Sequence, residues 1–60
     1  MSGKFELYTD NAGKFRFRLK ASNGQVIASS QGYVSRKSAL DGIASVRNNA
    51  PEAPIVEVEE

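Results

Sequence analysis

An unbroken alternation of apolar and basic residues between Lys14 and Ala21 is the feature that most constrains the fold of this chain. Side chains along a strand point alternately to its two faces, so an alternating run predicts a strand with one buried and one exposed face. One face of this predicted strand is apolar and the other is cationic. The apolar face carries Phe15, Phe17, Leu19 and Ala21, and the cationic face carries Lys14, Arg16, Arg18 and Lys20.

The pair Asn23-Gly24 follows this run and precedes a second β-prone run, Val26 to Ser30. Asn-Gly between two such runs is the strongest short-range indication of a β-hairpin, because both central positions of a type I′ turn require a positive φ. The predicted hairpin pairs Ala21 with Val26, Lys20 with Ile27, Leu19 with Ala28 and Arg18 with Ser29. Ile27 then lies on the cationic face, where we expect the stems of basic side chains or a second chain to cover part of it.

A first strand is predicted at Lys4 to Thr9, which also alternates. A three-residue loop, Asn11 to Gly13, joins it to the next strand, and Gly13 supplies the left-handed position that such loops require. A shift of one residue would place Leu7 beside an arginine, so the register is well specified. The predicted pairs are Asp10 with Lys14, Thr9 with Phe15, Leu7 with Phe17, and Phe5 with Leu19.

The period of the apolar residues becomes helical from Arg36 to Asn48, with Ser35 as the N-cap. Gly42 lies near the apolar stripe, and we expect close packing against the sheet to be the reason for a glycine there. Asn49 is predicted to end the helix in the left-handed conformation, because Pro51 prevents continuation. The apolar stripe consists of Ala39, Leu40, Ile43, Val46 and Ala50.

Strand propensity returns at Ile55 to Glu59, after a short extended segment from Pro51 to Pro54. The predicted order is therefore β-β-β-α-β: a three-stranded antiparallel meander, one helix and a C-terminal strand. The fold class is α+β, and residues 1–60 form a single domain.

Sixty residues give only a thin core, because a chain of this length buries only ~60% of the surface that its unfolded form exposes. Cysteine and histidine are absent, which excludes disulfides, thiolate metal sites and the commonest general base. We therefore expect no cofactor and no resident metal, and a partner subunit that completes the core.

The net charge of +1 argues against a strongly electrostatic nucleic-acid binder as a whole. An acidic tail of Glu57, Glu59 and Glu60 offsets much of the positive charge. This tail could weakly hold a hard cation, although acids at a strand end more often protect an edge from aggregation. No apolar run approaches the ~18 residues of a membrane span and no leader is evident, so we expect a cytoplasmic protein without a membrane segment.

Four segments taken together resemble the small bacterial YegP-like family: Lys14–Ala21, Asn23–Gln25, Ser30–Tyr33 and Gly42–Ala50. The match extends over nearly the whole chain. The resemblance implies a β3-α-β unit that occurs in tandem or as a dimer, with the last strand exchanged between units to complete one sheet. Only one unit is present here, so this architecture would need two chains. The family supplies no catalytic residues and no biochemical activity.

A binding surface for polyanions is one candidate function. The cationic strand face with Tyr8 nearby could bind a phosphate backbone and stack a base, although a charged face that only maintains solubility is the simpler interpretation. The start of the helix could also attract an anion, because Arg36 and Lys37 add to its free N–H groups. The candidate contacts are Tyr8, Arg16, Arg18, Lys20, Arg36 and Lys37.

Catalysis is not expected, since no two carboxylates stand at a working spacing and no serine has a histidine to activate it. The favoured hypothesis is a non-enzymatic interaction or structural module that works as a homodimer, with no other protein partner identified. Crossing of the last strand would cover an open sheet edge. The predicted dimer contacts are Ile55, Val56 and Val58.

Overall fold

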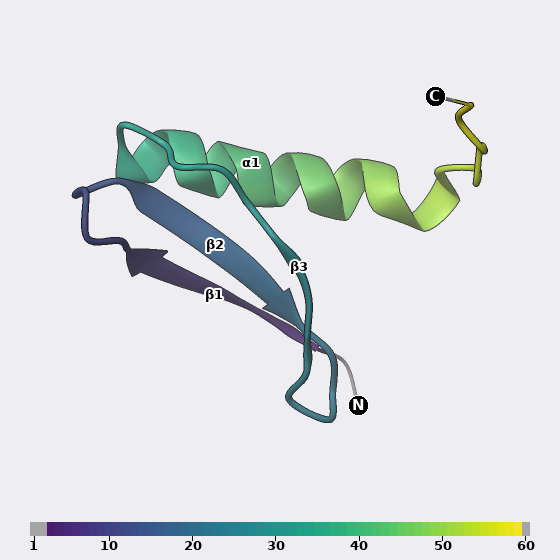
Figure 1. The fold of residues 1–60 in the computed structure, drawn as a ribbon, viewed down its shortest axis with the longest axis horizontal. Coiled ribbons are helices and arrows are strands. Elements are labelled where there is room, and N and C mark those ends of the chain that lie inside the picture. The colour runs from purple at the N-terminus through teal and green to yellow at the C-terminus, as the bar shows by residue number, and fades with distance from the viewer. Residues whose placement is uncertain (1–2, 60) are drawn as a thin grey trace.

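The computed structural model describes residues 3–59 of the chain as two layers (Figure 1). One layer is an antiparallel sheet in the order β1-β2-β3, and the helix α1 lies across one face of it. The predicted α+β class, the three-stranded meander and the single helix are confirmed. The elements are β1 (Lys4–Thr9), β2 (Phe15–Lys20), β3 (Val26–Ser29), α1 (Arg36–Asn49) and the short 3₁₀ helix η1 (Ala50–Glu52).

The first hairpin forms in the predicted register, with Leu7 opposite Phe17 and Phe5 opposite Leu19. Its loop closes through two backbone bonds, from Asp10 N to Lys14 O at 2.9 Å and from Gly13 N to Asp10 O at 3.0 Å. Gly13 has a φ of 80°, the left-handed conformation expected at this position. Pairing of apolar with apolar residues thus determined the register, as the sequence indicated.

The second hairpin differs from the prediction in its turn. Gly24 has a φ of 89°, but no residue other than glycine has a positive φ among residues 3–59, so Asn23 does not form a type I′ turn. The backbone bonds from Gly24 N to Ala21 O and from Ala21 N to Gln25 O instead close a three-residue loop like the first one. Asn23 stabilises this loop because its Oδ1 accepts a bond from Gln25 N at 3.0 Å.

The loop is one residue shorter than the predicted pair of Ala21 with Val26 required, and this shifts the register next to the turn. Leu19 lies opposite Ala28 as predicted, but Lys20 lies opposite Val26, so the predicted pairs of Lys20 with Ile27 and of Ala21 with Val26 are wrong. Ile27 is the additional residue of a β-bulge, and it is 60% exposed. Most of the Ile27 side chain is therefore uncovered in the single chain, and cover by a second chain stays a prediction.

The connection from β3 to α1 is attached to β2. Tyr33 and Phe15 exchange backbone bonds of 2.7 and 2.9 Å, and Ser30 Oγ accepts a bond from Phe17 N at 2.9 Å. The Tyr33 ring stacks on Phe17, with the ring centroids 6.1 Å apart. The sequence indicated only a break in the strand here, whereas this bridge fixes where the helix begins.

The helix begins as predicted, because Ser35 Oγ accepts a bond from Ser38 N at 3.1 Å. Its end differs from the prediction: Asn49 has a φ of −98°, and the chain continues into η1 instead of turning left-handed. Pro51 explains this, since proline cannot continue an α-helix but suits the first turn of a new helical segment.

The core is thin. Only Phe17, at 7% exposure, and Ala39, at 0%, are buried among the described residues. Ile43 and Val46 of the predicted stripe are half-buried, while Leu40 remains 40% exposed. The two layers therefore enclose much less apolar surface than the alternation in the sequence provides.

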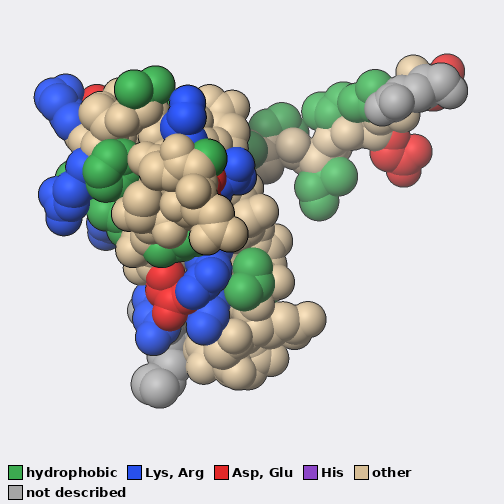
Figure 2. Space-filling view, turned by 60° about the vertical axis from the view of Figure 1, so that its left-hand side comes forward, with side chains coloured by type: hydrophobic (Ala, Val, Ile, Leu, Met, Phe, Trp, Pro, Cys, Tyr) green, Lys and Arg blue, Asp and Glu red, His purple; other side chains and the backbone are tan. Residues whose placement is uncertain are grey.

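The predicted C-terminal strand does not form in the single chain. Residues 53–59 have no regular secondary structure and extend away from the two layers as an arm (Figures 1 and 2). A strand needs a neighbour to pair with, and residues 3–52 place none beside the arm. The arm is exposed along its length, with Ile55 at 99%, Val56 at 71% and Val58 at 74%.

Candidate functional site

The outer face of the sheet, opposite the helix, carries a cluster of ion pairs around Glu6. Arg18 Nε donates to Glu6 Oε1 at 2.7 Å, and Lys20 Nζ and Lys4 Nζ lie 3.4 and 3.6 Å from the same carboxylate. The hydrogen bond from Arg18 is the main cause that holds the pKa of Glu6 below its usual value, followed in the same direction by Lys20. One carboxylate thus contacts three basic side chains.

Arg16 is engaged in a second set of contacts at the other end of the hairpin. Its Nε pairs with Asp10 Oδ2, and its Nη1 donates to Ser30 O at 3.2 Å. Asp10 Oδ1 also accepts the backbone N–H groups of Ala12 and Lys14 at 2.9 Å. The bond from Arg16 and then the bond from Lys14 lower the pKa of Asp10.

Tyr8 contacts the same basic surface. The Arg18 guanidinium lies over the Tyr8 ring, 4.7 Å from its centroid. A nucleic-acid base could stack on this face of the ring only by displacing Arg18. One surface therefore carries four of the predicted polyanion contacts: Tyr8, Arg16, Arg18 and Lys20. The three basic residues of this set already pair with acidic side chains.

Arg36 and Lys37 lie elsewhere, in the first turn of α1. Lys37 Nζ pairs with Asp41 Oδ2 at 3.2 Å, and both side chains are largely exposed. The helix covers the apolar face of the sheet, so these two residues are in the layer on the far side from the basic strand residues. The structure does not bring the six predicted contacts into one site.

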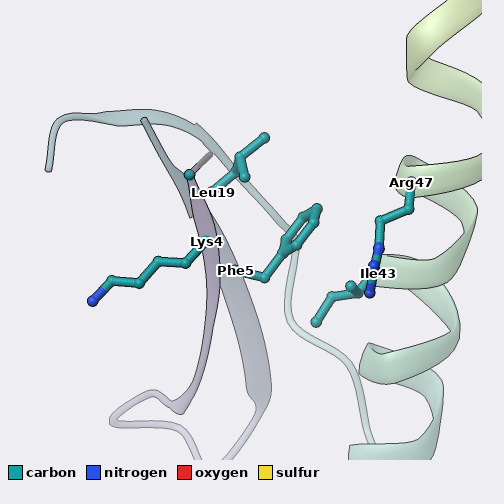
Figure 3. A pocket seen from close by; sticks show the side chains of 6 residues that line it. Lys4, Phe5, Leu19, Ile43 and Arg47 are labelled. Atoms are coloured by element: carbon teal, nitrogen blue, oxygen red, sulfur yellow. The ribbon is translucent and has the colours of Figure 1, made fainter. Parts of the chain in front are cut away.

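A cleft opens where the helix and the sheet diverge, and no sequence pattern indicated it. Its volume is about 550 Å³. Phe5 and Leu19 point from the sheet toward the helix, where Ile43 and Arg47 face them (Figure 3). The lining residues are Gly3, Lys4, Phe5, Leu19, Ile43 and Arg47.

The positive charge that faces the cleft comes from Arg47, because Lys4, the other ionisable lining residue, points its side chain away from the helix (Figure 3). Arg47 makes no ion pair within residues 3–59. Phe5, on the floor, packs edge-to-face on Phe17 with centroids 5.9 Å apart, so the apolar floor continues into the core. The cleft is therefore suited to an apolar group that carries a negative charge.

Metal-binding and membrane-spanning features are not found in the described part of the chain. Residues 3–59 contain no group of three or more acidic side chains close enough to hold a metal ion. None of their helices has the length and apolar character needed to cross a bilayer.

Comparison with known proteins relates this chain to a family distributed over bacteria and archaea. A UPF0339 protein of Treponema denticola is 60% identical over 58 residues, covering 97% of this chain and 100% of that protein. A UPF0339 protein of Methanosarcina acetivorans is 57% identical over 56 residues, covering 93% and 97%. UPF0339 protein YegP of Escherichia coli is 52% identical over 52 residues, covering 87% of this chain and 47% of that protein. This chain thus spans about half of YegP, and the family is not restricted to bacteria as the resemblance implied.

Two solved structures are similar to the fold. The solution structure of a protein from Haloferax volcanii has a TM-score of 0.85 at 41% identity and covers 95% of this chain and 97% of that one. Protein ATU0232 from Agrobacterium tumefaciens has a TM-score of 0.79 at 47% identity, covering 92% and 89%. A family model described as "Domain of unknown function (DUF1508)" matches residues 10–57. YegP is a relative of this chain. The chain belongs to this DUF1508 family, whose biochemical function is unknown.

Proposed function

We propose that this protein is a non-enzymatic interaction module whose working form is a homodimer, in which the C-terminal arm (residues 53–59) of each protomer crosses to the other. The observation that carries this proposal is the arm itself. It displays Ile55, Val56 and Val58 to solvent at 99%, 71% and 74% exposure. Apolar residues gathered on an exposed segment are typical of an interaction surface.

The rest of the fold supports a partner of the same kind. The outer strands β1 and β3 each pair on one side only, which leaves two open sheet edges within residues 3–59. An open edge binds a further strand readily, since its backbone N–H and C=O groups have no partner in the sheet. With only Phe17 and Ala39 buried, a second chain would also add apolar burial that the single chain lacks.

The relatives are consistent with pairing of units. This chain matches 47% of E. coli YegP, so the remainder of that protein is long enough to hold a second unit. Two units in one chain and two copies of a one-unit chain would then be equivalent arrangements.

A non-enzymatic role is supported by the side chains that the structure describes. Glu6 and Asp10 are committed to ion pairs with arginines, and the sequence has neither histidine nor cysteine. No described cluster combines a nucleophile with a base, which is the minimum for covalent catalysis.

The test is the mass in solution, measured by sedimentation equilibrium on the full chain and on a chain that ends at Pro54. We expect a dimer for the first and a monomer for the second, with a melting temperature that rises with concentration only for the full chain. A full-length monomer at high micromolar concentration, with a melting temperature independent of concentration, would refute the proposal.

Polyanion binding by the outer face is a second candidate. This face and its hairpin carry five basic residues and two acidic ones, Glu6 and Asp10, so the net charge of the face is positive. The basic set is Lys4, Lys14, Arg16, Arg18 and Lys20. Titration of a short single-stranded nucleic acid at several salt concentrations tests it, because each phosphate contact steepens the salt dependence. Absence of binding at low salt would eliminate this candidate and leave the homodimer untouched.

A further inference from the structure

We propose that Asn23, in the loop between β2 and β3, is a site of self-modification that converts to aspartate or isoaspartate by loss of ammonia. The loop, residues 22–24, closes the second hairpin and is exposed. Its hydrogen bonds restrain the reaction, so that conversion proceeds only when this end of the hairpin opens. Figure 1 shows the loop well separated from the C-terminal arm, so the site is independent of the dimer proposed above.

The sequence directs the reaction to one asparagine. Among the four asparagines of the chain, only Asn23 precedes a glycine. A side chain on the following residue hinders the approach of its backbone nitrogen to the asparagine amide, and glycine has no side chain. A β-carbon at position 24 would meet no atom within 4 Å, so the surroundings of Gly24 are open to water. The other asparagines are Asn11, Asn48 and Asn49.

The covalent step needs only water. The backbone nitrogen of Gly24 attacks the carboxamide carbon of Asn23, and the proton of that nitrogen passes to solvent. The new bond closes a cyclic imide while the bond to Nδ2 breaks, and Nδ2 leaves as ammonia. Water then adds to one of the imide carbonyls and opens the ring. Opening on one side gives aspartate, and opening on the other gives isoaspartate, in which the main chain runs through the former side chain.

The closed loop restrains both reacting groups. The N–H group of Gly24, which must lose its proton, donates to Ala21 O at 2.9 Å. The carboxamide oxygen of Asn23 accepts the N–H of Gln25 at 3.0 Å, which fixes the side chain. Ring closure requires the nitrogen to face the carboxamide carbon at about 3–3.5 Å. The bond to Ala21 must therefore break before the ring can close.

This end of the hairpin opens at low cost, because β3 contributes little burial. All four residues of β3 are exposed. The register also shifts between Leu19 and Lys20, close to the loop, which interrupts the ladder. Segments with few buried apolar contacts and exposed backbone bonds are the first to open in native proteins. The reaction therefore proceeds in the folded protein, at a rate set by the opening of the loop.

The two products differ in what they do to the hairpin. Aspartate keeps a side-chain oxygen that accepts the N–H of Gln25, so the loop survives. Isoaspartate lengthens the main chain of the loop by one carbon and removes that acceptor, so we expect the pairing of β2 with β3 to weaken. Either product adds one negative charge, which brings the formal net charge from +1 to zero. A protein without net charge associates more readily.

The first test follows the full chain through incubation in a mildly alkaline buffer. Trypsin places Asn11 and Asn23 on separate peptides, because Lys14 and Lys20 lie between them. Mass spectrometry measures the loss of each amide, and chromatography separates aspartate from isoaspartate. We expect Asn23 to convert at least about tenfold faster than Asn11. Conversion of Asn23 no faster than that of Asn11 would overturn the modification site.

A second test concerns the restraint by the loop. A synthetic peptide of residues 21–26, which is too short to hold a hairpin, gives the unrestrained rate in the same buffer. We expect Asn23 to convert about tenfold more slowly in the folded chain than in this peptide. Ser22→Pro suits the first position of the type I turn in such a loop and should slow conversion further in the folded chain only. Equal rates in chain and peptide, unchanged by Ser22→Pro, would show that the loop bonds do not restrain the reaction.

A third test separates the effects of the two products. The chain is short enough for chemical synthesis, so isoaspartate can be placed at position 23 directly, beside the variant Asn23→Asp. We expect Asn23→Asp to keep the parent melting temperature and the isoaspartate chain to melt at a lower temperature. Equal melting temperatures for the two would overturn the assigned effect of isoaspartate on the hairpin.

Discussion

Gly42 of α1 lies so close to Tyr33 that a β-carbon at position 42 would stand 2.6 Å from the Tyr33 hydroxyl oxygen and 3.0 Å from Cζ. The same β-carbon would be 3.2 Å from Cε2 of Phe17. A glycine in mid-helix costs ~1 kcal/mol relative to alanine, and here the missing side chain allows the helix to approach the two stacked rings. The predicted reason for the glycine, close packing on the sheet, is confirmed.

The contact predicts that Gly42→Ala destabilises the fold even though it improves helix propensity. Overpacking costs about 1–3 kcal/mol, which exceeds the gain of ~1 kcal/mol, so the melting temperature should fall. Tyr33→Phe in the same chain removes the nearest atom and should recover part of the loss. Asn48→Ala, at an exposed site of the same helix, should not destabilise. An unchanged or higher melting temperature for Gly42→Ala would contradict the packing.

Ala39 is the most buried residue of the helix, at 0% exposure, and Ala44 is exposed on the same helix. We expect Ala39→Asp to abolish cooperative unfolding, because a carboxylate buried without a partner costs several kcal/mol in a domain of marginal stability. Ala44→Asp makes the same chemical change in solvent and should cost less than ~1 kcal/mol. Circular dichroism melts of both variants check this, and similar melts for the two would show the helix facing to be wrong.

Substitutions of Gly24 test the conformation of the three-residue loop that forms in place of the expected type I′ turn. The φ of Gly24 is 89°, and a β-carbon there would meet no atom within 4 Å, so only backbone conformation opposes a side chain. Gly24→Val should cost about 1–2 kcal/mol, while Gly24→Asn should cost less because asparagine tolerates the left-handed region. Chemical denaturation of both variants measures the difference. Equal losses would mean that the conformation at position 24 is not the cause.

The ion pairs of Glu6 predict how the stability of the fold declines at low pH. The pKa of Glu6 is lowered by the bond from Arg18 and by Lys20, so the folded state favours the carboxylate. This contribution is present above the ordinary pKa of 4.5 and is lost as the pH falls through the lowered folded value. Glu6→Gln should therefore reduce stability at pH 7 and flatten the decline below pH ~4.5.

Melting temperatures from pH 2 to 7 measure this effect. Glu52→Gln, at an exposed position without an ion pair among residues 3–59, is the matched control and should keep the parent profile. If Glu6→Gln also keeps the parent profile, the ion pairs around Glu6 do not contribute to the pH dependence.

The parts of the fold that the sequence predicted correctly are those decided by local chemistry. Leu7 opposite Phe17 follows from alternation, and the N-cap at Ser35 follows from one hydroxyl and its spacing to Ser38. Two of the errors have a common origin, since each involves a choice between two locally acceptable backbones. Asn23 tolerates a positive φ but does not adopt one, and Pro51 ends an α-helix while beginning η1.

The candidate sites were only partly predictable. Tyr8 and Arg18 share a face as their positions in the alternation require, but the sequence did not show that Arg18 covers the Tyr8 ring or that Glu6 gathers three basic side chains. The cleft was missed altogether. It arises because α1 and the β1–β2 end of the sheet diverge, so residues as distant in sequence as Phe5 and Arg47 line one space. No local sequence pattern encodes how far the helix and the sheet diverge.

Asp10 joins the two parts of the first hairpin with a single side chain. One oxygen accepts the N–H groups of Ala12 and Lys14 in the loop, and the other binds Arg16 in β2. All of these partners lie within six residues of Asp10, so the contacts need little loop closure and can form before the helix docks. The hairpin is thus placed to start folding, and Asp10→Ala should slow the refolding rate far more than it accelerates unfolding.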